Sequence, residues 1–160
     1  MKKQLLASAI LGLATISIQA DEAAGQAAGQ AAGQAAYALC SACHNADGQG
    51  LPLGDKKMAP SLVGSKVVMG DPSVLALVIL KGIKKEGTEY MGMMAPLEAA
   101  YPDDQKLADV MSYVRQSFGN EAGAVSAEDA AKFRVKWADI KEPVTRAKIA
   151  ELGKPAEGKE

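Results

Sequence analysis

The sequence predicts an all-α fold whose core is filled only in part by the chain's own side chains. No segment shows the alternation of apolar and polar residues that is typical of strands, whereas several segments combine helix caps with apolar positions at helical spacing. Hydrophobic residues make up 48% of the 160 residues, but aromatic residues make up only 4%. The core is therefore expected to be modest, with room for another group inside it.

The first 20 residues have the layout of a secretory signal peptide. Lys2 and Lys3 precede an apolar stretch over residues 5–18, and Ala20 supplies a small residue at the expected cleavage point. The stretch is short for a membrane span, and no later apolar run is long enough for one. We therefore expect residues 1–20 to be removed and the mature protein to be secreted into the periplasm.

Residues 21–32 form an Ala/Gly/Gln-rich leader built on the repeat AAGQ. Each glycine in a helix costs about 1 kcal/mol relative to alanine, so the sequence favours a flexible, low-complexity segment over residues 21–31. Alternatively, a helix would place Gly25, Gly29 and Gly33 on one slowly drifting stripe. Helix becomes the better expectation closer to Cys40.

Glycine, proline, aspartate and asparagine are frequent over residues 45–70, which predicts loops there. A helix is then expected between Asp71, a good N-cap followed by Pro72, and Gly82, a typical helix end. Its body, VLALVIL, is apolar on all sides and should therefore be buried on several of them.

A second helix should begin after Asp103 and stop at Gly119-Asn120, since apolar residues recur between them at helical spacing. Those residues are Leu107, Val110, Met111, Val114 and Phe118.

Residues 121–160 are predicted to form a helical C-terminal extension. Ser126 and Asp129 resemble a capping pair for a third helix, and a short fourth helix is expected between Thr145 and Leu152. One stripe of the third helix either packs back on the preceding domain or faces another protein. This stripe consists of Ala130, Phe133 and Trp137, and Ile140 continues it beyond the helix.

The charge balance excludes a class of partners. The chain has 18 basic and 19 acidic residues, a formal net charge of −1, and loss of Lys2 and Lys3 would make it slightly more acidic. Nucleic acid binding, which depends on an excess of basic residues, is therefore not expected.

Both cysteines and the only histidine of the chain lie within five positions, as Cys40-Ser41-Ala42-Cys43-His44. The pattern C-x-x-C-H is the attachment signature of haem c. Its spacing lets both sulfurs form thioethers to one porphyrin, while the histidine that follows lies beneath the iron as its proximal ligand.

Other interpretations of this motif are weaker. A disulfide between residues so close in sequence would stabilise the fold little. A thioredoxin-like redox pair needs a βαβ unit, for which no strands are predicted. A structural zinc site needs four ligands, and the chain has no further cysteine or histidine. A chance exposed occurrence of the motif is rare.

The chain resembles the class I c-type cytochromes from about residue 33 to residue 120. The resemblance implies the all-α fold of that family wrapped around one covalent haem c, with residues 121–160 added to it. It is carried by four stretches: GQAAYALCSACHNADGQG, MAPSLVGS, MGMMAPL and LADVMSYVRQSFGN.

The resemblance also implies the other residues that bind the haem. The iron of the family is usually held between histidine and methionine, and Met94-Ala95-Pro96 fits the family pattern best, with Met91 and Met93 as alternatives. Methionine also packs adaptably, so all three could merely fill space around the cofactor. The carbonyl of Pro60 should accept the free N–H of His44, and Leu62 should lie on the haem face.

Further positions match the family as packing residues. Gly33 and Tyr37 resemble its N-terminal helix, which the C-terminal helix crosses closely, here through Val110 and Tyr113. Two departures stand out. Asn45 replaces the glycine common after the motif, although asparagine tolerates a left-handed backbone, and the family's frequent haem-domain tryptophan is missing.

Histidine and methionine together leave no open iron position, which predicts an electron carrier rather than an enzyme. Its partners would be redox proteins such as a periplasmic dehydrogenase or a terminal oxidase or reductase. The alternative is a haem enzyme or a gas- or peroxide-responsive protein whose methionine dissociates. Six lysines either form a basic ring for docking or are ordinary surface: Lys56, Lys57, Lys66, Lys81, Lys84 and Lys85.

Overall fold

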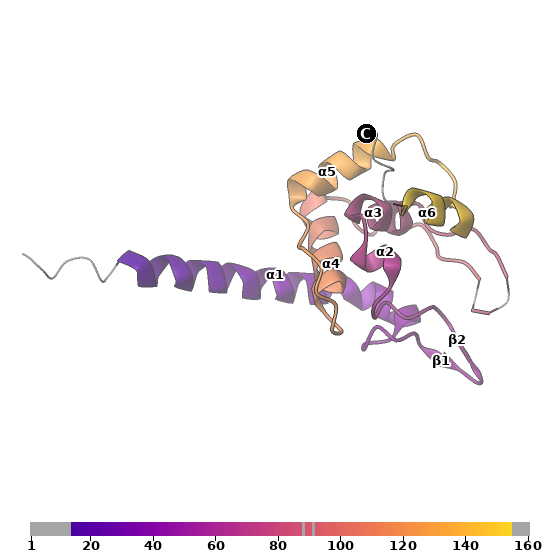
Figure 1. The fold of residues 1–160 in the computed structure, drawn as a ribbon, viewed down its shortest axis with the longest axis horizontal. Coiled ribbons are helices and arrows are strands. Elements are labelled where there is room, and N and C mark those ends of the chain that lie inside the picture. Colours follow the sequence, from indigo (N-terminus) through magenta and orange to yellow (C-terminus); the bar gives the residue numbers. More distant parts are fainter. Residues whose placement is uncertain (1–13, 88, 91, 155–160) are drawn as a thin grey trace, which may run out of the picture.

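The computed structural model describes residues 14–87, 89–90 and 92–154, and over these residues the chain is mainly helical, as predicted. Figure 1 shows a long first helix that runs into a cluster formed by the other helices. In chain order the elements are α1 (Ala14–His44), β1 (Pro52–Leu53), β2 (Lys56–Lys57), α2 (Lys66–Met69), α3 (Pro72–Lys81), α4 (Asp104–Gln116), α5 (Ala127–Lys136) and α6 (Arg146–Leu152).

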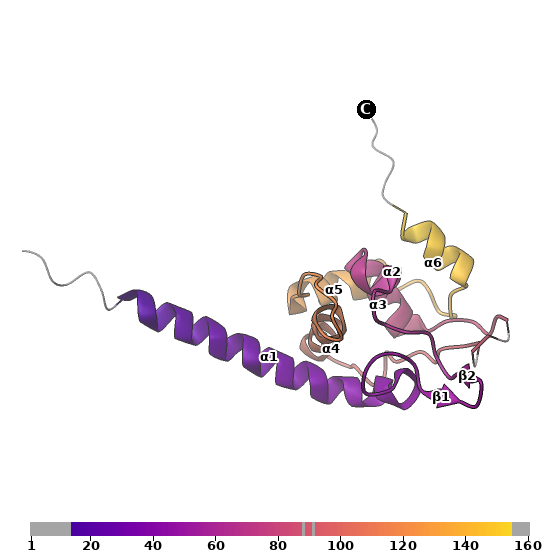
Figure 2. The same ribbon diagram turned by 60° about the horizontal axis from the view of Figure 1, so that its bottom comes forward.

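Helix α1 corrects the expectation of a flexible leader over residues 21–31. It is continuous from Ala14 to His44, and its first half extends away from the other helices in both views (Figures 1 and 2). Alanine and glutamine are strong helix formers, and they outweigh the cost of one glycine in every four residues. Residues 1–13 of the predicted signal peptide lie outside the described residues. Within the described residues, no helix combines the length and apolar character needed to cross a membrane.

Helices α1 and α4 cross closely at Gly33, as predicted. A Cβ atom placed on Gly33 would lie 2.5 Å from the carbonyl oxygen of Asp109 and 2.6 Å from Cβ of Tyr113. Beside this crossing, the ring of Tyr37 lies 5.3 Å from that of Tyr113 and 5.2 Å from that of Phe118, measured between centroids. The absence of a side chain at residue 33 thus brings the end of α1 against α4.

Helix α3 has the predicted boundaries and is buried over residues 73–81. The Asp71 carboxylate accepts a hydrogen bond from the backbone N–H of Ser73, and Gly82 follows the last turn. Helix α4 also begins where predicted, since the Asp103 carboxylate accepts from the N–H of Lys106. It ends at Gln116, three residues before the expected stop.

The segment over residues 45–70 is mostly irregular, as predicted, but it includes two short elements. Strands β1 and β2 form an antiparallel pair of two residues each, and α2 is a single turn. The end of α2 is tied to α4 by Arg115, whose buried guanidinium donates to the carbonyl oxygens of Val68 and Gly70 at 2.7 and 3.0 Å.

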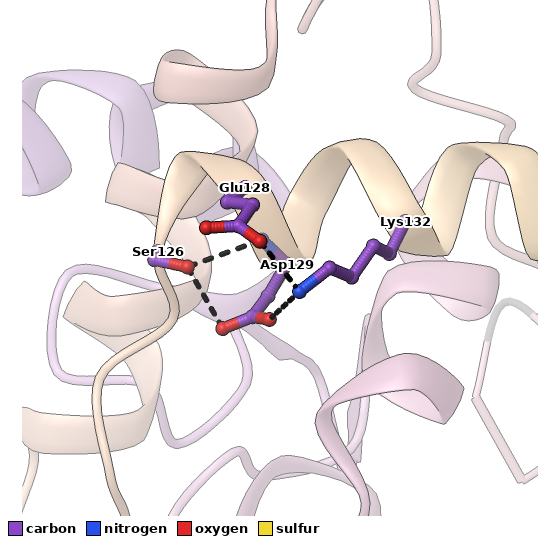
Figure 3. Close-up of polar contacts among 4 residues, drawn as sticks. All are labelled: Ser126, Glu128, Asp129 and Lys132. Atoms are coloured by element: carbon purple, nitrogen blue, oxygen red, sulfur yellow. Dashed lines mark hydrogen bonds and ion pairs between the residues drawn. The ribbon is translucent and has the colours of Figure 1, made fainter.

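Helix α5 begins with the predicted cap (Figure 3). The hydroxyl oxygen of Ser126 accepts from the N–H of Asp129 at 3.1 Å and donates to its carboxylate at 2.8 Å. Lys132 lies 2.9 Å from the carboxylate of Glu128 and 3.4 Å from that of Asp129. These contacts order the first turn of α5 on the protein surface.

The C-terminal extension packs back on the preceding helices, which decides between the two alternatives for its apolar stripe. Trp137 is buried against α3, and its indole N–H donates to the carbonyl oxygen of Ser73 at 2.7 Å. Val144 and Ile149 join the same apolar cluster. Helix α6 begins after Thr145, close to the predicted position.

Candidate functional site

The last turn of α1 presents both cysteines and the histidine on neighbouring positions. Cys40 is partly buried and Cys43 is exposed, and neither forms a disulfide. His44 is the final residue of the helix, so the chain turns away immediately after it. Both thiols are therefore available for thioether formation on one side of the same helix end.

Tyr101 lies beside the first cysteine and was not anticipated from the sequence. Its hydroxyl oxygen is 3.3 Å from Sγ of Cys40 and donates to the carbonyl oxygen of Ala36 at 3.0 Å. The side chain is only 1% exposed. Burial raises the pKa of both Tyr101 and Cys40, so both groups are neutral. Tyr101 thereby joins the segment before α4 to the haem-attachment turn.

The expected contact between His44 and Pro60 is present. Nδ1 of His44 lies 3.0 Å from the carbonyl oxygen of Pro60. Because a carbonyl can only accept, Nδ1 carries the proton, which leaves Nε2 with a lone pair for a metal. Burial lowers the pKa of His44 and so favours the neutral imidazole that ligates metals.

The loop that carries Pro60 and Leu62 is held by Asn120, for which the sequence suggested only a helix stop. The buried side-chain amide of Asn120 donates to the carbonyl oxygen of Leu62 at 3.1 Å and accepts from the N–H of Gly64 at 2.8 Å. It also donates to the carbonyl oxygen of Val114 at 2.8 Å. One amide just beyond α4 thus fixes this loop at Leu62 and Gly64.

The turn after the motif closes back on α1. Asn45 adopts the predicted left-handed conformation, with φ of 63°. Its carbonyl oxygen accepts from the hydroxyl of Tyr37 at 2.7 Å, and the N–H of Gly50 donates to the carbonyl oxygen of His44 at 2.8 Å. Gly50 has φ of 89°, and a Cβ there would overlap the carbonyl oxygen of Ala59. Glycine therefore lets the Pro60 loop approach the histidine.

Met94 lies in a loop that is pinned by backbone pairing. Its N–H donates to the carbonyl oxygen of Ile83 at 3.0 Å, and its own carbonyl accepts from the N–H of Ile83 at 2.9 Å. The Met94 side chain is partly buried and packs in an apolar cluster, whereas Met93 is 55% exposed. Met91 lies outside the described residues.

These residues fit a haem. The buried side chains form two apolar clusters; Cys40 and Leu62 pack against the first, Met94 packs against the second, and Val67 contacts both. Cys40 and Met94 thus border two apolar clusters that share Val67, which suits an apolar cofactor. The donor set, a neutral imidazole and a thioether, is the one that holds haem iron in many cytochromes.

The cytochrome c family model matches residues 30–118, which is more than half of the chain. The chain belongs to the cytochrome c family. Its cofactor is accordingly a covalently bound haem c, and the two cysteines of the C-x-x-C-H motif lie in the arrangement that attachment requires. The residues that match include the whole motif, the Pro60 loop, Met94 and α4.

Curated relatives of the chain include the cytochrome c subunits of quinone alcohol dehydrogenases. It is 37% identical over 109 residues to the cytochrome c subunit of the quinone alcohol dehydrogenase of Gluconobacter oxydans, covering 63% of this chain but 21% of that protein. The corresponding subunit of Komagataeibacter europaeus is 35% identical over the same length. The chain therefore spans about a fifth of the length of these subunits.

A relative of similar size is cytochrome c-552 of Thermus thermophilus. It is 29% identical over 145 residues, which cover 85% of this chain and 88% of that protein. The similarity to this relative thus reaches beyond residues 30–118, which the family model matches.

Proposed function

We propose that this protein is a periplasmic electron carrier with one haem c. In this proposal Cys40 and Cys43 hold the porphyrin covalently, and His44 and Met94 are the axial ligands. The supporting observation is the hydrogen bond from His44 to Pro60, which fixes the imidazole tautomer and orientation on the residue that follows the attachment cysteines. Haem c supplies an iron that changes between the ferrous and ferric states.

The chain's own residues would keep the iron surroundings unchanged between these states. Pro60 orients the imidazole, and Asn120 fixes the loop on which Pro60 lies. The Met94 backbone is paired on both its N–H and its carbonyl. Rigid ligands reorganise little when the charge on the iron changes, which suits electron transfer better than substrate binding.

The partner we propose is a quinone-linked dehydrogenase or another periplasmic redox protein. The support is the similarity to the cytochrome c subunits of quinone alcohol dehydrogenases. Of the six lysines considered for a basic docking ring, Lys81 is not available, because it is buried and lies 2.8 Å from the carboxylate of Glu98. Lys66, Lys84 and Lys85 are exposed.

The assignment of Met94 is tested by its replacement with alanine. A methionine sulfur bound to ferric haem iron gives a weak absorption band at the red end of the visible spectrum. Met94→Ala should abolish this band, because the sulfur is lost. Met93→Ala is the matched control, since it removes an exposed neighbouring methionine and should leave the band unchanged. A band that survives in Met94→Ala would contradict the assignment.

A further inference from the structure

The C-terminal extension contacts the loop that carries Met94. The N–H of Val144 donates to the carbonyl oxygen of Gly82 at 3.1 Å, and the N–H of Lys84 donates to the carbonyl oxygen of Val144 at 2.8 Å. Ile83, which lies between Gly82 and Lys84, pairs on its other side with Met94. Residues 82–84 therefore lie between Met94 on one side and Val144 on the other, and Val144 is outside the residues that the family model matches.

Arg146 links the two arms of this loop. Its backbone N–H donates to the Glu86 carboxylate at 2.8 Å, and its guanidinium lies 3.5 Å from the same oxygen. The guanidinium also donates to the carbonyl oxygen of Gly92 at 3.4 Å, and that carbonyl accepts from the N–H of Glu86 at 2.8 Å. One residue therefore contacts the chain both before and after the tip of the loop.

Apolar packing strengthens the same contact. Val144 and Ile149 are buried, and they belong to the cluster against which Ile83 and Met94 pack. A movement of the loop away from the core would expose these side chains as well as break the hydrogen bonds. The extension thus makes polar and apolar contacts with the loop that would be lost together.

We propose that residues 144–146, which we call the C-terminal strap, hold the Met94 loop in place and control how readily methionine leaves the iron. This proposal rests on the His44/Met94 ligation proposed above. A methionine ligand can be replaced by an external ligand only when its loop moves. Contacts that exist only while the loop lies against the core favour the methionine-bound form, by the free energy that these contacts contribute. Val144 and Arg146 are therefore positioning residues for the axial ligand.

Arg146→Met in the full-length holoprotein tests the strap. The probe is imidazole, which competes with methionine for ferric iron. Its binding is monitored through the loss of the methionine absorption band. A half-exposed ion pair contributes about 0.2–1 kcal/mol, so imidazole should bind roughly 1.4- to five-fold more tightly to the variant. Hydrogen exchange of the Met94 amide should accelerate by a similar factor. Lys148→Met is the matched control, because the ion pair of Lys148 with Glu151 lies within α6.

Glu86→Ala should reproduce the effect, because Glu86 accepts from both the backbone and the side chain of Arg146. If the two side chains act through one contact, the double variant should bind imidazole no more than slightly better than Glu86→Ala alone, because Arg146→Met leaves the backbone hydrogen bond to Glu86 in place. A wild-type methionine band together with unchanged imidazole binding in Arg146→Met and Glu86→Ala would overturn the strap alone. A different result would contradict the proposed Met94 ligation itself: a methionine band that persists in Met94→Ala.

Discussion

Gly33 is the residue at which the crossing of α1 and α4 is sensitive to added volume. A methyl group there would meet the backbone of Asp109 and the side chain of Tyr113. Gly33→Ala should therefore destabilise the holoprotein by about 1–3 kcal/mol, although alanine is the better helix former. The measurement is denaturant unfolding followed by far-UV circular dichroism.

Gly29 provides the matched control one repeat earlier in the same helix. Nothing lies within 4 Å of a Cβ placed on it. Gly29→Ala should therefore stabilise α1 by up to about 1 kcal/mol through helix propensity alone. If both substitutions changed stability in the same direction, the close crossing at Gly33 would not be the cause.

The residues that carry the chemistry differ in how far the sequence could predict them. Cys40, Cys43 and His44 are recognisable because their chemistry requires a fixed local spacing. Tyr101 and Asn120 gave no such signal, because their partners Cys40 and Leu62 lie 61 and 58 residues away in the sequence. Pro60 could be anticipated only through the family resemblance, since a proline carbonyl has no distinctive pattern of its own.

At the scale of elements, the cap of α5 predicts a dependence of stability on pH. Hydrogen bonds from Ser126 and then Lys132 hold the pKa of Asp129 below its ordinary value of 3.8. Because the pKa is lowered on folding, this carboxylate stabilises the folded state above pH 3.8, and the contribution is lost as the pH falls below that value.

Asp129→Asn should consequently lower stability at neutral pH, and the difference from wild type should shrink at pH values below 3.8. Urea unfolding at several pH values measures this. Asp139→Asn, which removes a carboxylate outside the cap, serves as the control. A deficit of Asp129→Asn that stays constant down to the lowest pH would show that the charge of Asp129 is not the cause.

The helices with clear caps were predicted well because their signals are local. Asp71, Asp103, Ser126 and Thr145 each accept a hydrogen bond at the start of their helix. The single turn α2 could not be predicted, because contacts such as those of Arg115 support it from α4. The prediction of a flexible leader was wrong because it gave the helix cost of glycine more weight than the helix propensity of the alanines and glutamines around it.

For the whole molecule, the packing of the extension predicts that the haem domain depends on it. Trp137 covers α3 and binds Ser73, so Trp137→Ala should cost about 3–5 kcal/mol. Val135→Ala, two residues earlier and 78% exposed, should change stability by less than about 0.5 kcal/mol. Thermal unfolding of the two holoproteins compares them.

Truncation after Asn120 extends the same test to the whole extension. It removes the buried residues Trp137, Val144 and Ile149 together, so the fragment should lose most of its stability. A truncated holoprotein that unfolds at the wild-type temperature would contradict this account. It would favour a role for the extension in docking instead.

The architecture as a whole was predictable because the motif and the resemblance both indicated a helical fold around a cofactor. The arrangement of residues 121–160 was not, because an apolar stripe packs equally well on the same chain or on a partner. The backbone pairing of Val144 with residues 82–84 was also hidden, since hydrogen bonds between main-chain groups carry no side-chain pattern.

The most direct test of the central claim is the visible spectrum of the protein produced in a host that attaches haem c. The account predicts a coloured chain whose oxidised and reduced forms both show six-coordinate iron, and whose colour stays with the polypeptide after denaturation. A polypeptide that is colourless, or that releases its haem on denaturation, would contradict covalent attachment through Cys40 and Cys43.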